Sequence, residues 1–272
     1  MKQPRKHLLC LLLALWLTGV LLAGCAADTA DANADLPVIT VGCDNYPPFT
    51  YVNSDGKPVG IDVELADEAF RRMGYRPEYI TINWTEKNAL LESGAIDCIW
   101  GCFSMNGRED EYIWAGPYMY SHQVVAVMPD SDIQTLADLA GKTVVVQATT
   151  KPESLFLDGN DPRIPEIRAL HSLQKQELIY SHLAKGYADA VAAHEISILQ
   201  YMADYGAEFR ILEEPLEVVG LGVAFSRSDD RGIAQALCAT LEQMRTDGTT
   251  RSILASYLAD PDKYLEADGY AD

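Results

Sequence analysis

Apolar and polar positions recur along the chain with two periods, one typical of strands and the other of helices. Short apolar runs at 38–41, 123–128, 144–146, 188–192 and 218–225 predict buried strands. The segments between them carry apolar residues three and four positions apart, which predicts amphipathic helices. The alternation of strands with helices indicates an α/β protein with mostly parallel sheets.

Three helices have recognisable ends. Asp62 is expected to cap the first, which Gly74 ends, and its apolar residues share one face: Leu65, Ala66, Ala69, Phe70 and Met73. A second helix is expected to begin at Ser172 and a third, longer one at Ser228.

Two predicted strands, 123–128 and 218–225, join two successive αβ patterns. The chain is therefore expected to form one lobe from residues 36–124 plus 222–272 and another from residues 125–221. Ligands of open α/β sheets bind beyond the carboxyl ends of the strands, so the expected site is the cleft between the lobes.

The first residues have the pattern of an export signal. Basic residues at positions 2–6 precede an apolar run at 8–22, and the sequence LAGC at 22–25 resembles the bacterial lipobox. We expect a lipoprotein signal peptide at 1–24, an acylated Cys25, and a flexible tether at 25–35. The alternative is an uncleaved anchor, although the run is short for a spanning helix of about 20 residues. The expected location is extracytoplasmic, lipid-anchored to the bacterial cell membrane.

Composition excludes some partners and cofactors. A formal net charge of −19 argues against binding to nucleic acid or to an anionic bilayer surface. Beyond the signal and Cys25, the cysteines have no zinc-type spacing, so no metal or other cofactor is expected: Cys43, Cys98, Cys102 and Cys238. A disulfide between Cys43 and Cys102 is one alternative, although buried free thiols are favoured.

The stretch 97–110 carries the clearest chemistry. It begins as a strand and breaks into a loop that contains Ser104, Gly107 and Arg108. A fixed guanidinium beside a hydroxyl and free backbone N–H groups suits a small carboxylate. The alternative is a turn whose arginine forms a surface ion pair.

Several motifs together resemble one family, the extracellular solute-binding proteins of family 3. They are GCDNYPPF at 42–49, GIDVELA at 60–66, SGAID at 93–97, WAGPY at 114–118, LADLAGKTV at 136–144, QATT at 147–150, KGYADAV at 185–191 and RTDGT at 245–249. The resemblance implies the two-lobed type II periplasmic-binding fold, in which two crossover strands form the hinge. It also implies a monomeric, non-enzymatic substrate-binding component of an ABC importer, which captures an amino acid and delivers it to a membrane permease.

The resemblance also implies the binding residues. Tyr46 and Trp84 would be the aromatic walls, although either ring is also suited to a core. Ser104 and Arg108 would bind the carboxylate, and the backbone of Gly101 and Cys102 would face the ammonium. Thr149 and Thr150 would contribute from a helix N-terminus, where simple capping is the alternative.

This chain departs from the family pattern in two places. The loop 104–108 is about one residue shorter than the common form, and the carboxylate that grips the ammonium falls on His194. Its neighbour Glu195 is therefore favoured as the amine partner, and a Glu195→Gln change is expected to weaken binding. Asp44 is a candidate partner for a basic side chain, or it only orders its loop.

Two other functions fit the same fold. Cyclohexadienyl or arogenate dehydratases share it, with Glu195 or His194 as the candidate acid or base here. A sensory protein that presents ligand to a separate receptor is the other. No pattern of nucleophilic or metal-dependent catalysis accompanies them, so a binding protein is expected.

Overall fold

The computed structural model describes residues 35–267, and the chain from Pro37 onward forms one compact unit. The predicted signal peptide and Cys25 lie outside the described residues. None of the described helices is both long and apolar enough to cross a bilayer.

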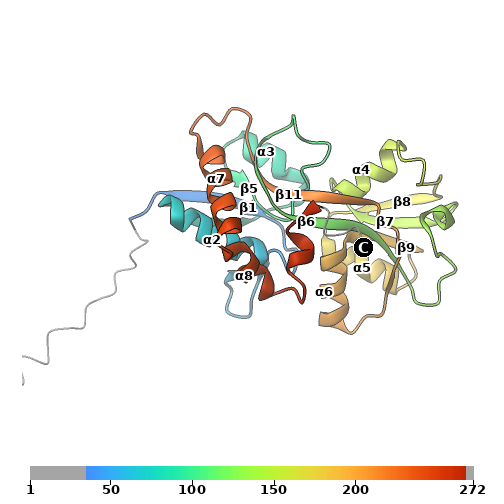
Figure 1. The fold of residues 1–272 in the computed structure, drawn as a ribbon. Helices are drawn as coiled ribbons and strands as arrows, with labels where there is room; N and C mark the ends of the chain where they lie inside the picture. The colour runs from blue at the N-terminus through green and yellow to red at the C-terminus, as the bar shows by residue number, and fades with distance from the viewer. Residues whose placement is uncertain (1–34, 268–272) are drawn as a thin grey trace, which may run out of the picture. The chain divides into compact units, whose positions relative to one another are not determined.

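A nine-stranded sheet runs through this unit in the order β4-β1-β5-β11-β6-β9-β7-β8, and β10 pairs with β6 (Figure 1). Its strands are β1 (Val38–Cys43), β4 (Arg76–Thr81), β5 (Cys98–Ile99), β6 (Ile113–Val127), β7 (Thr143–Gln147), β8 (Ala169–Leu173), β9 (Ala190–His194), β10 (Arg210–Ile211) and β11 (Glu217–Phe225). A separate two-stranded ribbon consists of β2 (Tyr51–Val52) and β3 (Pro58–Val59).

The sheet is parallel at its ends and antiparallel in its middle. β1 pairs in parallel with β4 and β5, and β7 does so with β8 and β9. Between these groups the long strands β6 and β11 pair with each other in antiparallel fashion. The predicted α/β class is confirmed, and the two expected sheets are continuous through β6 and β11.

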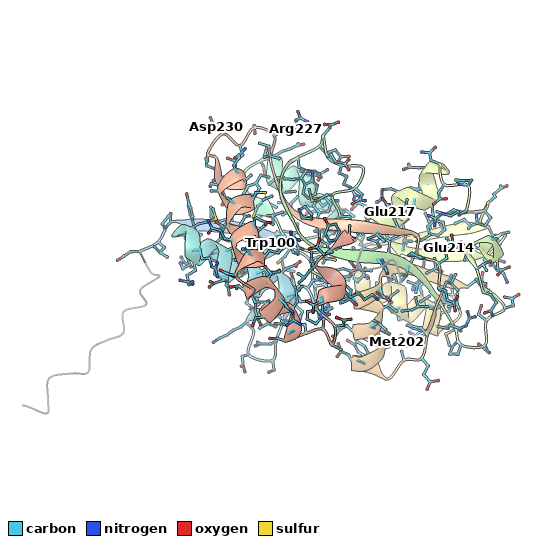
Figure 2. The ribbon with its side chains drawn as sticks, in the orientation of Figure 1. Trp100, Met202, Glu214, Glu217, Arg227 and Asp230 are labelled. Carbon is cyan, nitrogen blue, oxygen red and sulfur yellow. The ribbon has the colours of Figure 1, made fainter. Side chains whose placement is uncertain are left out.

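Separate apolar cores lie on either side of these two strands. We call the part that contains β1, β4 and β5 lobe 1; its helices are α2 (Ile61–Met73), η1 (Trp84–Glu86), α3 (Lys87–Glu92), α7 (Ile233–Thr246), α8 (Thr249–Ala255) and η3 (Asp262–Tyr264). Trp100, labelled in Figure 2, is fully buried in its core. The part that contains β7, β8 and β9 is lobe 2; its helices are η2 (Leu136–Leu139), α4 (Lys151–Asp158), α5 (Gln176–Ala184) and α6 (Glu195–Tyr205). The lobe boundaries expected at 124/125 and 221/222 stay a prediction.

The strands of lobe 2 show why a buried sheet has continuous apolar runs. Val144 and Val146 on β7 pack into the core on one face of the sheet, and Val145 packs into the core on the other. Successive side chains of a strand point to opposite faces, so a strand covered on both sides is apolar at every position.

Three predicted helix starts differ from the structure. α2 begins at Ile61 after Gly60, and Asp62 lies inside the first turn with its side chain buried. Ser172 belongs to strand β8, and the helix that follows starts three residues after Leu173. α7 begins after Gly232 rather than at Ser228. A hydroxyl or carboxylate caps a helix only where the chain turns beside it, which spacing alone does not specify.

Candidate functional site

A cavity opens where the strand ends of lobe 1 face the N-terminal ends of helices in lobe 2. Seventeen residues line it: Asp44, Tyr46, Trp84, Gly101, Cys102, Phe103, Ser104, Arg108, Gln123, Gln147, Thr150, Lys151, Pro152, Gln176, Ala192, Ala193 and His194. Of the eleven ligand-binding residues that the sequence predicts, nine lie on this wall. Thr149 and Glu195 do not line it.

The two predicted aromatic walls are firmly packed. The Tyr46 ring stacks on Phe49 and meets His194 edge-on, with centroids 5.7 and 6.0 Å away. The Trp84 ring meets Phe103 edge-on at 5.2 Å. These rings line the cavity and also belong to apolar clusters, so each ring is both a cavity wall and part of a core.

Arg108 is a half-buried cation at the edge of this wall. Its Nη1 donates to the backbone oxygen of Ser104 at 3.2 Å, and its guanidinium lies over the Phe103 ring at 5.3 Å. In the part of the chain that the structure describes, its guanidinium forms no ion pair with a carboxylate, and burial lowers its pKa. Such a group is positioned to receive an anionic ligand.

A second cation, Lys87, is fully buried behind Trp84. The Nζ atom of Lys87 is 5.1 Å from the Trp84 ring and donates to Oγ1 of Thr149 at 3.0 Å. Burial, and then the nearby Arg108, lower its pKa to about 8. This bond joins lobe 1 to lobe 2, and both cations make the surroundings of the cavity electropositive.

The two threonines at the start of α4 serve different purposes. Thr149 has a left-handed backbone, with φ 59°, and its N–H donates to Oε2 of Glu153 at 2.6 Å. Thr150 occupies the N-cap position, but its hydroxyl donates to the backbone oxygen of Gln147 at 2.6 Å instead of capping the helix. Only Thr150 reaches the cavity, because the turn at Thr149 directs that side chain towards Lys87.

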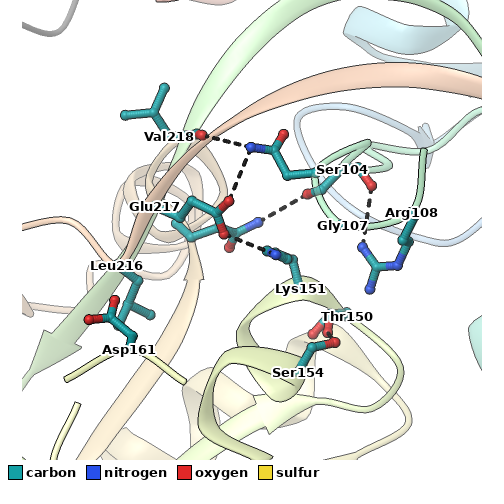
Figure 3. A network of polar contacts seen from close by, with 12 residues as sticks. Ser104, Gly107, Arg108, Thr150, Lys151, Ser154, Asp161, Leu216, Glu217 and Val218 are labelled. Carbon is teal, nitrogen blue, oxygen red and sulfur yellow. Dashed lines mark hydrogen bonds and ion pairs between the residues drawn. The ribbon is translucent and has the colours of Figure 1, made fainter. Parts of the chain in front are cut away.

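Lys151 is a lining residue that the sequence did not single out. Its Nζ forms an ion pair with Oε2 of Glu217 at 3.1 Å, and Oε1 of Glu217 accepts from Nδ2 of Asn106 at 3.1 Å (Figure 3). The carboxylate of Glu217 compensates the positive charge of Lys151, and the ion pair links α4 to strand β11.

The side chains of His194 and Glu195 lie in different surroundings at the end of β9. His194 is buried on the cavity wall, and burial lowers its pKa to about 3, so its ring is neutral near pH 7. Glu195 lies instead beside η3 of lobe 1, where Nζ of Lys263 is 3.0 Å from Oε2. The favoured assignment of Glu195 as amine partner therefore does not fit this arrangement, because its carboxylate is already engaged outside the cavity.

Asp44 is the carboxylate among the lining residues. Burial raises its pKa to about 6, and it accepts a hydrogen bond from Nε2 of Gln147 across the gap between the lobes. Asp44 therefore does more than order its own loop, since it contributes a second contact between the lobes.

Asp62 holds the backbone at Cys102. One carboxylate oxygen accepts the Cys102 N–H at 2.7 Å, and Cys102 has a left-handed φ of 51°. This bond fixes the turn from which the Gly101 and Cys102 backbone faces the cavity. Cys43 and Cys102 are free thiols, and both are buried.

We expect an Asp62→Asn change to flatten the dependence of stability on pH. Burial raises the pKa of Asp62 from 3.8 to about 7, because the folded protein favours the neutral carboxyl group. The contribution of this group to stability is therefore fully present below pH 4 and is lost as the pH rises through 7. Asparagine accepts the same N–H without ionising. At pH 8 the unfolding free energy of the variant should therefore exceed that of the wild type by roughly 2–4 kcal/mol. Urea unfolding at pH 4.5, 6 and 8 measures this, with the exposed Asp55→Asn as control. Parallel curves for Asp62→Asn and wild type would contradict it.

Three glutamines on the wall were not predicted as site residues: Gln123, Gln147 and Gln176. All three are buried. In the sequence, Gln123 opens an apolar run at 123–128, and Gln147 ends another. A polar residue at the end of a buried strand was the available signal, since a buried amide needs partners.

Comparison with known proteins agrees with this architecture. The family model for bacterial extracellular solute-binding proteins, family 3, matches residues 39–260. PatH of Vibrio harveyi, which bears the name of an amino-acid ABC transporter-binding protein, is 31% identical over 84% of this chain and 90% of its own length. The histidine-binding periplasmic protein of Salmonella typhimurium is 30% identical over 80% of this chain and 86% of its own.

Solved structures agree in fold. An ABC uptake transporter substrate binding protein from Streptococcus pneumoniae, with bound histidine, superposes with a TM-score of 0.75 at 23% identity, over 82% of this chain and 93% of that one. The match of the family model to most of the chain, together with these relatives, shows that the protein belongs to the bacterial extracellular solute-binding proteins of family 3.

Proposed function

We propose that this protein is the substrate-binding component of an amino-acid ABC importer and that the amino acid binds in the cavity between the lobes. The observation that carries the proposal is Arg108, a half-buried guanidinium on the cavity wall that has no carboxylate partner among the described residues. A ligand carboxylate would supply that partner with two oxygens. The names of PatH and of the Salmonella protein support an amino-acid ligand.

The binding mechanism follows from where the contacts originate. Arg108, Ser104 and Trp84 contact the ligand from lobe 1, while Thr150 and His194 do so from lobe 2. A ligand that touches both lobes stabilises the closed form relative to the open one. The contacts of Lys87 with Thr149 and of Asp44 with Gln147 add to closure. The closed lobes then present the surface that docks on the permease.

A ligand screen tests this function. Residues 26–272, which contain the whole compact unit, are heated with each of the twenty standard L-amino acids. A ligand at about 100 times its Kd should stabilise the protein by about 2.7 kcal/mol, which raises the Tm by roughly 5–10 °C. No shift with any amino acid, and no heat of binding by calorimetry, would contradict the proposal.

Catalysis is not part of the proposed function. His194, with its pKa lowered to about 3, is a poor proton acceptor near pH 7, and Glu195 is bound to Lys263 outside the cavity. Neither candidate acid or base of a dehydratase is therefore available in the cavity. Turnover of prephenate by the purified protein would contradict this.

We further propose that the mature protein is a monomer anchored by a lipid on Cys25, outside the cytoplasmic membrane. A Cys25→Ala change should then move the protein from the membrane fraction to the soluble fraction, because no acyl chain is attached. Fractionation with immunoblotting measures this, and Cys238→Ala is the matched control. Retention of Cys25→Ala in the membrane would favour an uncleaved anchor instead.

A further inference from the structure

Gln123 is a fully buried amide at the junction of the two lobes. It lies on β6, opposite His194 of β9 on one side and Glu217 of β11 on the other. It also lines the cavity. A fully buried glutamine side chain requires partners for both of its polar atoms.

The nitrogen of Gln123 has its partners within the protein. Nε2 donates to Nε2 of His194 at 2.8 Å and lies 3.3 Å from Oγ of Ser104. The amide nitrogen can only donate, so Nε2 of the neutral His194 ring is the acceptor of this bond. Nδ1 of the ring lies 3.0 Å from Oγ of Ser121.

The oxygen of Gln123 lacks a partner within the described part of the chain. Oε1 is buried and accepts no hydrogen bond from any residue between positions 35 and 267. A buried carbonyl without a donor is costly and rare, so its place on a cavity wall points to a donor that arrives with the ligand.

We propose that Gln123 contacts the ligand directly, with Oε1 accepting an N–H of the ligand's amino group while Arg108 takes the carboxylate. This inference rests on the proposed function. Ser104 connects the two groups, because its hydroxyl lies beside Nε2 of Gln123 and its backbone oxygen accepts from Arg108. Gln123 and Arg108 therefore both lie next to Ser104, and the carboxylate and amine of an α-amino acid are attached to one carbon atom.

The carboxylate that the sequence favours for this role is engaged outside the cavity, because Lys263 binds Glu195. Asp44, the candidate partner for a basic side chain, accepts from Gln147 at another part of the wall. A neutral amide is thus the proposed partner of the amine, which makes Gln123 a determinant of affinity and specificity.

Two substitutions of opposite character test the inference. Gln123→Met keeps the length and removes the acceptor, so it should weaken amino-acid binding about tenfold. Gln123→Glu keeps the shape and adds charge, so it should tighten binding about tenfold, because a charge-assisted bond is stronger. The neutral His194 ring compensates for the lost amide donor by carrying its proton on Nε2, from which it donates to the new carboxylate. Calorimetry with the standard amino acid that most stabilises the wild type measures both. Gln243→Glu, exposed on α7, controls for net charge.

The opposite changes in affinity distinguish a direct contact with the ligand from a purely structural role of Gln123. A purely structural role would weaken binding in both variants, and no role would leave both within twofold of wild type; either result overturns the inference. If Gln123→Met does not fold, Gln123→Glu decides alone, and a failure to tighten binding overturns it. A wild type that binds none of the twenty amino acids would overturn the proposed function, and this inference with it.

Discussion

An Arg108→Met variant should lose amino-acid binding by a factor of at least about 100. A guanidinium that forms two charge-assisted bonds to a carboxylate in a desolvated site typically accounts for several kcal/mol of affinity. Lysine cannot reproduce the planar fork, so Arg108→Lys should lose most of the same affinity. Calorimetry with the best amino acid from the thermal screen measures both losses.

The stability of the same variant separates binding from folding. Arg108 is half-buried without an ion pair among the described residues, and Lys87 raises the local positive charge further. Removal of Arg108 should therefore leave the unfolding free energy unchanged or raise it. Arg251→Met, which breaks an exposed ion pair with Asp262, is the control and should bind normally. Normal binding by Arg108→Met would exclude Arg108 as the carboxylate site.

A Gly60→Ala variant should be destabilised by about 3 kcal/mol or more, the second large effect that we expect. Gly60 has φ 125°, and a Cβ atom there would lie 2.4 Å from the backbone oxygen of Phe49. That oxygen and its neighbour on Pro48 accept the first N–H groups of α2. The backbone must therefore shift beside Tyr46, at a cost that adds to the strain of the conformation.

The matched control is Gly74→Ala. Gly74 also has a positive φ, 77°, but a Cβ atom added there would have no neighbour within 4 Å. Its cost should be about 1 kcal/mol, from the conformation alone. Urea unfolding of both variants measures the difference, and equal losses would show that the contact with Phe49 is unimportant.

Local sequence patterns were sufficient to predict the structure of a segment wherever that segment determines its own structure. The apolar face of α2 and the runs of β7 and β9 follow directly from spacing. Tyr46, Trp84, Ser104 and Arg108 lie at the ends of such segments, so their arrival at one cavity could be expected from strand order. The two apolar runs that join the αβ patterns, 123–128 and 218–225, overlap β6 and β11.

Contacts between distant segments were not visible. The direction of Glu195 depends on Lys263, which lies 68 positions away. The role of Asp62 depends on Cys102, and that of Thr149 on a left-handed turn and on Lys87. Gln123 escaped notice because its meaning depends on an oxygen left without a donor among the described residues, which only the folded arrangement reveals.

The path of the chain along β6 and back along β11 sets an order of assembly. α7 and α8 pack with α2 in the core of lobe 1, yet they follow all of lobe 2 in the sequence. A chain that emerges N-terminus first thus completes lobe 2 while the apolar face of α2 still lacks its cover. Lobe 1 can therefore complete its core only after lobe 2 has been synthesised.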